Sequence, residues 1–568
     1  MAAVAPSDGT YHTGHIDPLP HIFSSKQHTF KARIQAHYST FNNMWSPQSN
    51  IPVGYRRQLP LAVVVLAFAF LQLKVVLKSA IPGDLRSRRE LDVNLTYPLN
   101  ANWTYLPTHQ HENEDQKDKE AEATNISSPI DTKPLNVVLL YADDWSFNSL
   151  GLMNDYIQTP VLDRMARENI FFTHSCVVTS ICMQSRATLY TGQYSSRHQT
   201  YFAYRKPVNM YKTRVWKRTL YPLMMKAGYH VGFFGKYHHL PFPNHIPTFS
   251  EHHFMPFSHY VERDGATKHI TEWNTIDAMK FLKNKPADKP FFLTVSFFAT
   301  HAEDGNKEQY RPMNSSMNLY NDGPVPLPKT YTEEHWNAMP YFFKNNRRNF
   351  GRARFMHRYS NPGQYQHMMK NTYRMVTEVD SACGKIIDYL NATNQLDNTM
   401  IIFTSDNGNM HGQHGLAEKW FAYEESLRVP LIVHDPRVAG GKNHVEDSFT
   451  LNIDLAPTIL SAAGVTVPKA MQGRDLADLY LRQQAGRKQF LYEYWDNNRD
   501  IPNSVALVRK DFKFIFWNDY NYHQVFDMKN DPLEEHDLYN ATDRKKLNKT
   551  LHKIMKLQRH ARKGVAQW

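Results

Sequence analysis

The 568-residue sequence has only three cysteines, Cys176, Cys182 and Cys383, and only one long apolar run. So few cysteines exclude a disulfide-rich scaffold, and none of them forms a Cys-x-x-Cys metal pair. With 41% hydrophobic and 21% charged residues, the chain as a whole is not disordered, collagen-like or a polytopic membrane protein. A globular chain with room for a large core remains. Its formal charge of +12 favours anionic partners without identifying them.

The apolar run, residues 59–77, is long enough to cross a bilayer core. We interpret it as a transmembrane signal anchor between an N-terminal tail, 1–58, and an acidic, unstructured stalk, 78–133. Were Met44 the true start, the same run would be a cleavable signal; a buried core helix is the third interpretation. Sequons on the far side of the run favour a lumenal chain of the Golgi, lysosome or cell surface. They begin at Asn94, Asn102, Asn125, Asn314, Asn391, Asn540 and Asn548.

After residue 133, short apolar runs alternate with amphipathic segments. This pattern predicts an α/β fold with a large, mostly parallel or mixed sheet flanked by helices. Helices are expected at 160–168 and 373–390, and the second places Cys383 in the core. Alternating residues at 504–508 and 512–516 predict an antiparallel hairpin, and hence a smaller C-terminal subdomain built on an antiparallel sheet.

Polar side chains follow four of the apolar runs. In an open α/β sheet, ligands bind in the crevice beyond the carboxyl ends of the strands. Four neighbouring parallel strands would therefore bring these side chains to one place. Run 135–141 is followed by Asp143 and Asp144, 400–403 by Asp406 and Asn407, 291–298 by His301, and 231–234 by Lys236 and His238.

Three carboxylates in one place, with an amide oxygen beside them, raise the pKa values of one another unless a cation lies among them. Oxygen ligands without a thiolate pair select a hard ion, and a loose oxygen set suits Ca²⁺ at least as well as Mg²⁺. A helix cap or a turn explains either acidic pair alone. The recurrence of a pair after two matched strands favours a metal site.

Residues 179–194 read TSICMQSRATLYTGQY, a small-residue turn followed by a helix-compatible segment. Cys182 and Ser185 are thus expected near a helix N-terminus, where free N–H groups favour an anion and lower the pKa of a nucleophile. A lone cysteine is more often an inert core residue. Beside Arg186 and the predicted metal site, the reactive interpretation is favoured.

These residues resemble the type I sulfatase family of the alkaline phosphatase superfamily. The family signature, Cys-x-Pro-Ser-Arg followed by Thr-Gly, stands here as Cys182, Met183, Gln184, Ser185, Arg186, Thr191 and Gly192. Similar segments are NVVLLYADDWSFNSLG, FFGKYHH, SFFATHAED, TSDNGNMHGQHGLAEKWFAYEESLRVPLIV, NIDLAPTILSAAGVTVP and, for the C-terminal subdomain, VFDMKNDPLEEHDL. The resemblance implies a sulfuric ester hydrolase with a catalytic domain, 134–485, and a C-terminal subdomain, 486–568.

In that family the signature cysteine is oxidised in the endoplasmic reticulum to formylglycine, whose hydrate attacks the sulfur of a sulfate ester. The resemblance therefore implies a formylglycine-generating enzyme as partner and one Ca²⁺ ion as cofactor. Its implied ligands are Asp143, Asp144, Asp406, Asn407 and the modified residue 182. The other implied roles are Arg186 for the hydrate, Lys236, His301 and Lys419 for the sulfate oxygens, His238 as base, and His301 or Lys419 as the acid for the leaving alcohol.

Three interpretations of function follow. The first is a sulfatase acting on a sulfated small molecule or glycan, with no nucleic-acid partner. The second is a phosphonate monoester or phosphodiester hydrolase, which uses the same signature. The third is an inactive glycan-binding homologue, because Gln184 replaces the signature proline. The basic segment 544–563, with nine Lys or Arg, is either a packed helix with a solvated face or a polyanion contact.

Overall fold

The computed structural model describes residues 134–200, 213–238, 246–345, 349–438, 444–496 and 500–563. The predicted tail, transmembrane anchor and stalk, residues 1–133, lie outside this part of the chain. Within it, no helix combines the length and the apolar character needed to span a membrane. The four sequon asparagines that it includes are exposed: Asn314, Asn391, Asn540 and Asn548.

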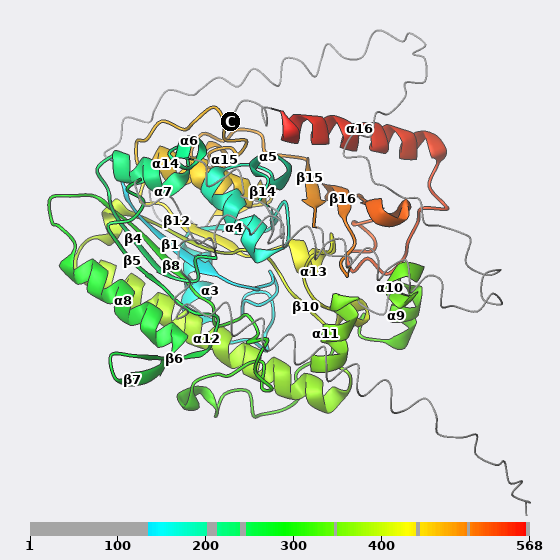
Figure 1. Cartoon of the computed structure of the whole chain (residues 1–568), viewed down its shortest axis with the longest axis horizontal. Helices are drawn as coiled ribbons and strands as arrows, with labels where there is room; N and C mark the ends of the chain where they lie inside the picture. Colours follow the sequence, from blue (N-terminus) through cyan, green and yellow to red (C-terminus); the bar gives the residue numbers. More distant parts are fainter. Residues whose placement is uncertain are drawn as a thin grey trace, which may run out of the picture. The chain divides into compact units, whose positions relative to one another are not determined.

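A mixed sheet of eight strands is the largest sheet of the described residues (Figure 1). β9, β1, β8, β4 and β5 are parallel neighbours, and β12 runs antiparallel to both β9 and β2. The predicted α/β class with a mixed sheet is therefore confirmed. In spatial order the strands are β13 (His444–Glu446), β2 (Ile170–Phe172), β12 (Leu431–His434), β9 (Thr399–Ser405), β1 (Asn136–Ala142), β8 (Phe291–Ser296), β4 (His230–Gly235) and β5 (Glu251–Phe254).

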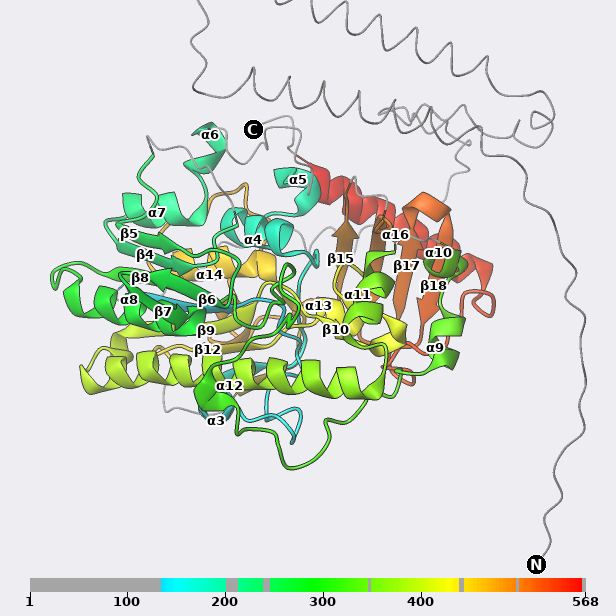
Figure 2. The same ribbon diagram turned by 60° about the horizontal axis from the view of Figure 1, so that its bottom comes forward.

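Helices cover both faces of this sheet (Figure 2). Val138 and Leu140 of β1 belong to one core layer, and Val137 and Leu139 to the other, so the strand is apolar on both sides. α3 (Pro160–Glu168), α8 (Ile270–Asn284) and α12 (Pro362–Ala392) cover the first face. α4 (Cys182–Thr191), α7 (Leu220–Lys226), α14 (Leu455–Ala462) and α15 (Ala477–Tyr480) cover the second.

The predicted helices are present, one of them in a longer form. α3 has the expected bounds, whereas the segment 373–390 is only the second part of α12, which starts at Pro362. The side chain of Asn361 accepts a hydrogen bond from the backbone N–H of Gln364, which caps this earlier start. Cys383 is fully buried in the core, as predicted.

The C-terminal part forms a four-stranded antiparallel sheet in the order β15-β16-β17-β18, with α16 packed against it. The predicted hairpin corresponds to β16 and β17, while the domain boundary at 485 stays a prediction. The bounds are β15 (Gln489–Tyr494), β16 (Ser504–Arg509), β17 (Lys513–Trp517), β18 (Tyr522–Phe526) and α16 (Arg544–Arg562). The other, shorter elements are β3 (Ser175–Cys176), α5 (Ser195–His198), α6 (Thr213–Trp216), β6 (Tyr260–Arg263), β7 (Ala266–His269), α9 (Glu333–Ala338), α10 (Tyr341–Asn345), α11 (Phe350–Arg358), β10 (Met410–His411), β11 (Ala417–Glu418), α13 (Glu424–Leu427) and β14 (Thr450–Leu451).

Candidate active site

The strand register brings the predicted site residues to one edge of the sheet. Ala142 of β1 lies opposite Ser405 of β9, so Asp143 and Asp406 leave the sheet at the same level. On the other side of β1, Tyr141 pairs with Ser296 of β8, which in turn pairs with Gly235 at the end of β4. Asp143, Asp406 and Lys236 therefore converge from three parallel strands.

Gly235 makes the close approach of β4 to β8 possible. Its φ is +117°, and a Cβ atom there would lie 1.9 Å from the backbone oxygen of Ser296. Any other residue would force the strand ends apart. The next residue, Lys236, donates its backbone N–H to the same oxygen at 2.9 Å, which fixes where its side chain leaves the strand.

Cys182 is the first residue of α4 and faces the two aspartates after β1. Its Sγ lies 3.4 Å from Oδ1 of Asp143 and 3.9 Å from Oδ1 of Asp144. The helix itself begins where Ser185 donates its N–H to the oxygen of Ile181. The N–H groups of the first turn remain outside the helical ladder, which is the geometry expected of an anion-binding helix start.

Three side-chain cations surround the buried carboxylates. Arg186 contacts Asp406 at 2.7 and 2.8 Å and Asp143 at 3.4 Å. Lys236 forms an ion pair with Asp143, and Lys419 contacts both oxygens of Asp144 at 2.6 and 2.7 Å. Each carboxylate thus has a cationic partner within the protein, so mutual repulsion alone does not demand a metal. The case for a metal rests on the donor atoms.

Those donor atoms suit a hard cation. Asn407 donates its amide nitrogen to Asp144 at 2.6 Å, while its buried amide oxygen accepts no hydrogen bond within the described residues. One atom from each of Asp143, Asp144, Cys182 and His301 lies within 4.8 Å of the others. Carboxylate and amide oxygens around one centre fit Ca²⁺ or Mg²⁺. The backbone N–H of Asp144 donates to Asp406 at 3.2 Å, which ties the second strand end to the group.

Burial controls the protonation of this group. Although burial raises it, nearby Lys236 and His301 hold the pKa of Asp143 well below its ordinary range. Burial raises the pKa of the Cys182 thiol well above its usual value, and Asp143 adds to the effect. An unmodified Cys182 is thus a neutral thiol here, beside an ionised Asp143. Burial, reinforced by Lys236 and Lys419, lowers the pKa of His301 well below its usual value.

The two predicted histidines differ in position. His301 lies in the site: its Nε2 is 3.7 Å from Asp144, and its Nδ1 donates to the backbone oxygen of Ala302 at 2.6 Å. His238 lies at the rim, where its ring centroid is 5.2 Å from that of Phe257. Phe257 is 54% exposed and its ring centroid lies 5.4 Å from Nζ of Lys236. An exposed phenyl ring thus lies beside one of the buried cations of the site.

The sequence analysis missed supporting residues around the site. Ser296 accepts from Arg186 at 2.6 Å and donates to the backbone oxygen of Lys236 at 2.8 Å. Glu418 lies 3.4 Å from Lys419 and also forms an ion pair with the buried Arg358. Both residues fall inside the quoted family segments, but Arg186, Lys236 and Arg358 lie far away from them in the chain, and no local pattern indicates these contacts.

Gln184, the departure from the family signature, has a structural role. It is fully buried, and its amide donates to the backbone oxygen of Trp495 at 2.8 Å. Its own oxygen accepts from the hydroxyl of Thr179 at 3.3 Å. The side chain therefore joins the start of α4 to the segment after β15, and its polar atoms are satisfied.

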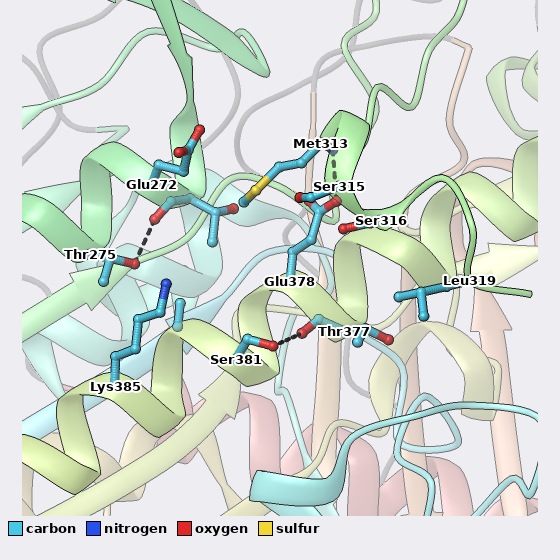
Figure 3. Close-up of a pocket in the computed structure, with 12 residues that line it drawn as sticks. Glu272, Thr275, Met313, Ser315, Ser316, Leu319, Thr377, Glu378, Ser381 and Lys385 are labelled. Carbon is cyan, nitrogen blue, oxygen red and sulfur yellow. Dashed lines mark hydrogen bonds between the residues drawn. The ribbon is translucent and has the colours of Figure 1, made fainter.

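A separate cavity of about 310 Å³ lies between α8, α12 and the 313–316 turn (Figure 3). It contains none of the predicted site residues. Glu378 reaches from α12 toward the turn and accepts from the backbone N–H of Met313 at 2.7 Å. Its other oxygen lies 3.7 Å from Nδ1 of His269. Burial raises the pKa of Glu378 to about 7 and lowers that of His269 to about 3. Between these two pH values both side chains are neutral, so they do not form an ion pair.

Replacing Glu378 by glutamine should make the protein more stable at neutral pH. The folded protein keeps the carboxyl proton up to a pKa of about 7, whereas an unfolded chain loses it near its usual value of 4.5. Folding stability is therefore lost as pH rises through that window, by up to roughly 3 kcal/mol. Urea unfolding from pH 4 to 8 should show E378Q equal to the wild type at pH 4 and more stable at pH 8. The exposed-residue control Glu334→Gln should show no such divergence, and a divergence in both variants would contradict the assignment.

Comparisons with known proteins agree with this geometry. The family model for sulfatases matches residues 135–465, and the model described as N-sulphoglucosamine sulphohydrolase, C-terminal, matches residues 412–561. The chain is 26% identical to an N-acetylglucosamine-6-O-sulfatase of Bacteroides thetaiotaomicron over 75% of this chain and 86% of that one.

Solved structures share the fold. A protein in complex with its substrate D-glucosamine-2-N,6-O-disulfate aligns with a TM-score of 0.62 and 23% identity, over 76% of this chain and 98% of that one. The phosphonate monoester hydrolase of Agrobacterium radiobacter aligns with a TM-score of 0.60 and 19% identity, over 76% and 96%. At these identities the alignments establish the fold alone. The family model, which covers more than half of the sequence, establishes that this chain belongs to the sulfatase family of sulfuric ester hydrolases.

Proposed function

We propose that this sulfatase hydrolyses sulfate esters of a sulfated glycan, with residue 182 as formylglycine and with one bound Ca²⁺. The observation that supports the proposal best is the position of Cys182 at the start of α4, 3.4 Å from Asp143 and among three buried side-chain cations. A nucleophile at this position would lie where an anionic group is attracted from several sides.

The site must first reduce the negative charge of the sulfate ester so that a nucleophile can attack its sulfur. A sulfate ester repels a nucleophile that carries negative charge, so the enzyme must neutralise its oxygens. Lys236, Lys419 and His301 border the site and are proposed to do so, while Arg186 holds the attacking group of residue 182. Because Arg186, Lys236 and Lys419 are already held by Asp143, Asp144 and Asp406, these three cations need little rearrangement during the reaction.

Asp143, Asp144, Asp406 and Asn407 are proposed to hold Ca²⁺ together with residue 182. Such an ion would supply positive charge that polarises the sulfate group. In its formylglycine form, residue 182 would supply a hydroxyl oxygen as nucleophile. The buried amide oxygen of Asn407, which accepts no hydrogen bond within the described residues, supports this ligand set.

Two proton transfers are needed, one to release sulfate and one to protonate the leaving alcohol. We propose His238 as the base that releases sulfate from residue 182, and His301 or Lys419 as the acid for the leaving alcohol. Nδ1 of His301 donates to a backbone carbonyl, so Nε2 faces the site and carries no proton in the neutral ring. As the acid, His301 would first take up a proton at Nε2, whereas Lys419 already carries one. The exposed Phe257 beside His238 offers an apolar edge for the substrate's alcohol part.

The glycan as substrate and the secretory pathway as location are supported indirectly. The names of one relative and one structural neighbour specify sulfated glucosamine compounds. Four exposed sequon asparagines are accessible to glycosylation. Formylglycine formation in the endoplasmic reticulum would require the same route. The anchor at 59–77 stays a prediction.

Turnover on matched substrates tests the proposal. Aryl sulfate should be hydrolysed much faster than an aryl phosphate diester or a phosphonate monoester, and defined sulfated saccharides should release sulfate. Faster turnover of the phosphorus esters would favour the phosphonate monoester hydrolase alternative, whose fold this chain shares. Ca²⁺-dependent binding of heparin-like chains without sulfate release would favour the inactive homologue.

Removal of divalent cations should lower both melting temperature and activity. A ligand present at 100 times its dissociation constant stabilises the folded state by about 2.7 kcal/mol, so a chelator reverses that gain. Calorimetry with chelator, with Ca²⁺ and with Mg²⁺ measures the shift without relying on turnover. The Asn407→Leu variant should have the same melting temperature with Ca²⁺ as without it. If the melting temperature of the wild type does not change when Ca²⁺ is added or removed, the metal assignment is refuted.

A further inference from the structure

α16 is a 19-residue helix that lies on the C-terminal antiparallel sheet (Figure 1). Its buried residues Leu547, Ile554 and Ala561 join a core cluster that includes Phe512 and Phe514. The apolar face of the helix is therefore already covered by its own protein. The opposite face points away from that core.

That opposite face carries a row of cations, which we call the basic stripe: Lys545, Lys549, Lys553, Lys556, Arg559 and Lys563. The residues recur every three or four positions, so at about 100° per residue they fall within about 120° of the helix circumference. Lys553 is half-buried and the other five are exposed. The stripe runs for about 27 Å along the helix at 1.5 Å per residue.

The basic stripe has no intramolecular partner among the described residues. α16 contains no Asp or Glu, and no ion pair with a described carboxylate involves any of the six residues. Like charges three or four positions apart destabilise a helix by about 0.2–0.5 kcal/mol per pair. Cations in the first turn also oppose the helix dipole. Arg559 and Lys563 lie at the other end, where the dipole favours a cation, so the cost of the stripe is the repulsion among its like charges. That repulsion is unrelieved by any described carboxylate, which indicates a role outside the fold.

One end of the stripe is linked to the nucleophile helix. The backbone oxygens of His560 and Ala561 accept from the side chain of Gln472, whose backbone N–H donates to Gly192 at the end of α4. Arg562 lies over the ring of Trp495 with its guanidinium carbon 5.6 Å from the ring centroid. The backbone oxygen of that tryptophan holds Gln184. A polymer on the stripe would thus be held by an element that is linked to α4 through Gln472.

We infer that the basic stripe binds a linear sulfated polysaccharide, as an attachment site for polymeric substrate separate from the active site. The inference rests on the proposed function for the choice of polyanion. Five of the six cations are lysines, point charges that suit a repeating anion better than one planar group. A membrane is disfavoured because insertion needs the apolar face that is already buried. Single-stranded nucleic acid is disfavoured because α16 has no Phe, Tyr or Trp for base stacking.

Heparin binding by the full chain tests the inference. The stripe variant is Lys549→Gln, Lys553→Gln, Lys556→Gln and Arg559→Gln. The matched control removes the same charge from exposed lysines elsewhere: Lys226→Gln, Lys280→Gln, Lys283→Gln and Lys289→Gln. At physiological salt the stripe variant should bind heparin at least 10-fold more weakly. The slope of log affinity against log salt should fall by roughly 3, because four cations no longer release counterions.

Two further readouts separate a binding role from a structural one. The stripe variant should melt no lower than the wild type, because like-charge repulsion has been removed, and its turnover of a small aryl sulfate should be unchanged. An equal loss in the control, or no loss in the stripe variant, would overturn the inference. So would tighter binding to phosphatidylserine vesicles or to RNA than to heparin. A wild type that binds heparin through the stripe but releases no sulfate would refute the proposed activity and not the stripe.

Discussion

Cys182→Ser will abolish sulfate release and leave the fold intact. The substitution exchanges one sulfur for oxygen at a buried position whose Sγ lies 3.4 Å from Asp143 and 3.9 Å from Asp144. It removes the source of the proposed formylglycine nucleophile, so we expect kcat to fall by about 10³-fold or more, beyond the effect of losing one stabilising donor. Turnover of an aryl sulfate and circular dichroism are the measurements.

Cys383→Ser is the matched control for this result. It makes the same atomic exchange at an equally buried cysteine of α12, remote from the site residues, and should leave kcat unchanged in the folded fraction. Mass spectrometry of the wild-type peptide containing residue 182 should find the aldehyde. Only thiol or disulfide in that peptide, or comparable rates for C182S and wild type, would mean that another residue performs the chemistry.

Lys513→Met should be the most destabilising single substitution considered. Lys513 of β17 is fully buried, and its Nζ lies 2.8 Å from both Glu424 and Glu534. Burial raises the pKa of Glu534 to about 8, whereas Lys513 offsets the burial of Glu424 and holds its pKa below the usual value. Methionine therefore preserves the packing volume but leaves the Glu424 carboxylate without this cation. Breaking a buried pair in this way costs about 3–5 kcal/mol. Denaturant unfolding measures the loss.

Two companion variants make the interpretation specific. Lys510→Met removes a lysine from the turn before the same strand, where the pair with Asp447 is exposed, and should cost at most about 1 kcal/mol. Adding Glu424→Gln to K513M should recover much of the lost stability, because the uncompensated charge disappears. If the double variant is no more stable than K513M, lost packing and not charge is the cause.

The convergence of the site was predictable from sequence because it depends on a general property of parallel strands. Asp143 and Asp406 each follow an apolar run, and in β1 and β9 those runs are adjacent and in register. The N-terminal position of Cys182 on α4 likewise follows from a small-residue turn before a helical segment.

The partners of the site residues were not predictable. Lys419 and Asp144 are separated by 275 positions, and no local period connects them. The sequence therefore does not reveal that three side-chain cations balance the three carboxylates, and repulsion among the carboxylates is weaker than their number suggests. The early start of α12 was missed because apolar spacing was weighed above the capping signal of Asn361.

The hydrogen bond between Gln184 and Trp495 limits how far the chain can be shortened from its C-terminal end. The segment after β15 supplies the acceptor for a buried amide in the first turn of the nucleophile helix, and Glu493 accepts from the hydroxyl of Ser195 and the N–H of Ser196 just beyond it. A chain cut at 485 would leave these donors without acceptors. The C-terminal sheet is thus part of the scaffold that orients residue 182, and shortened versions of this protein must retain it.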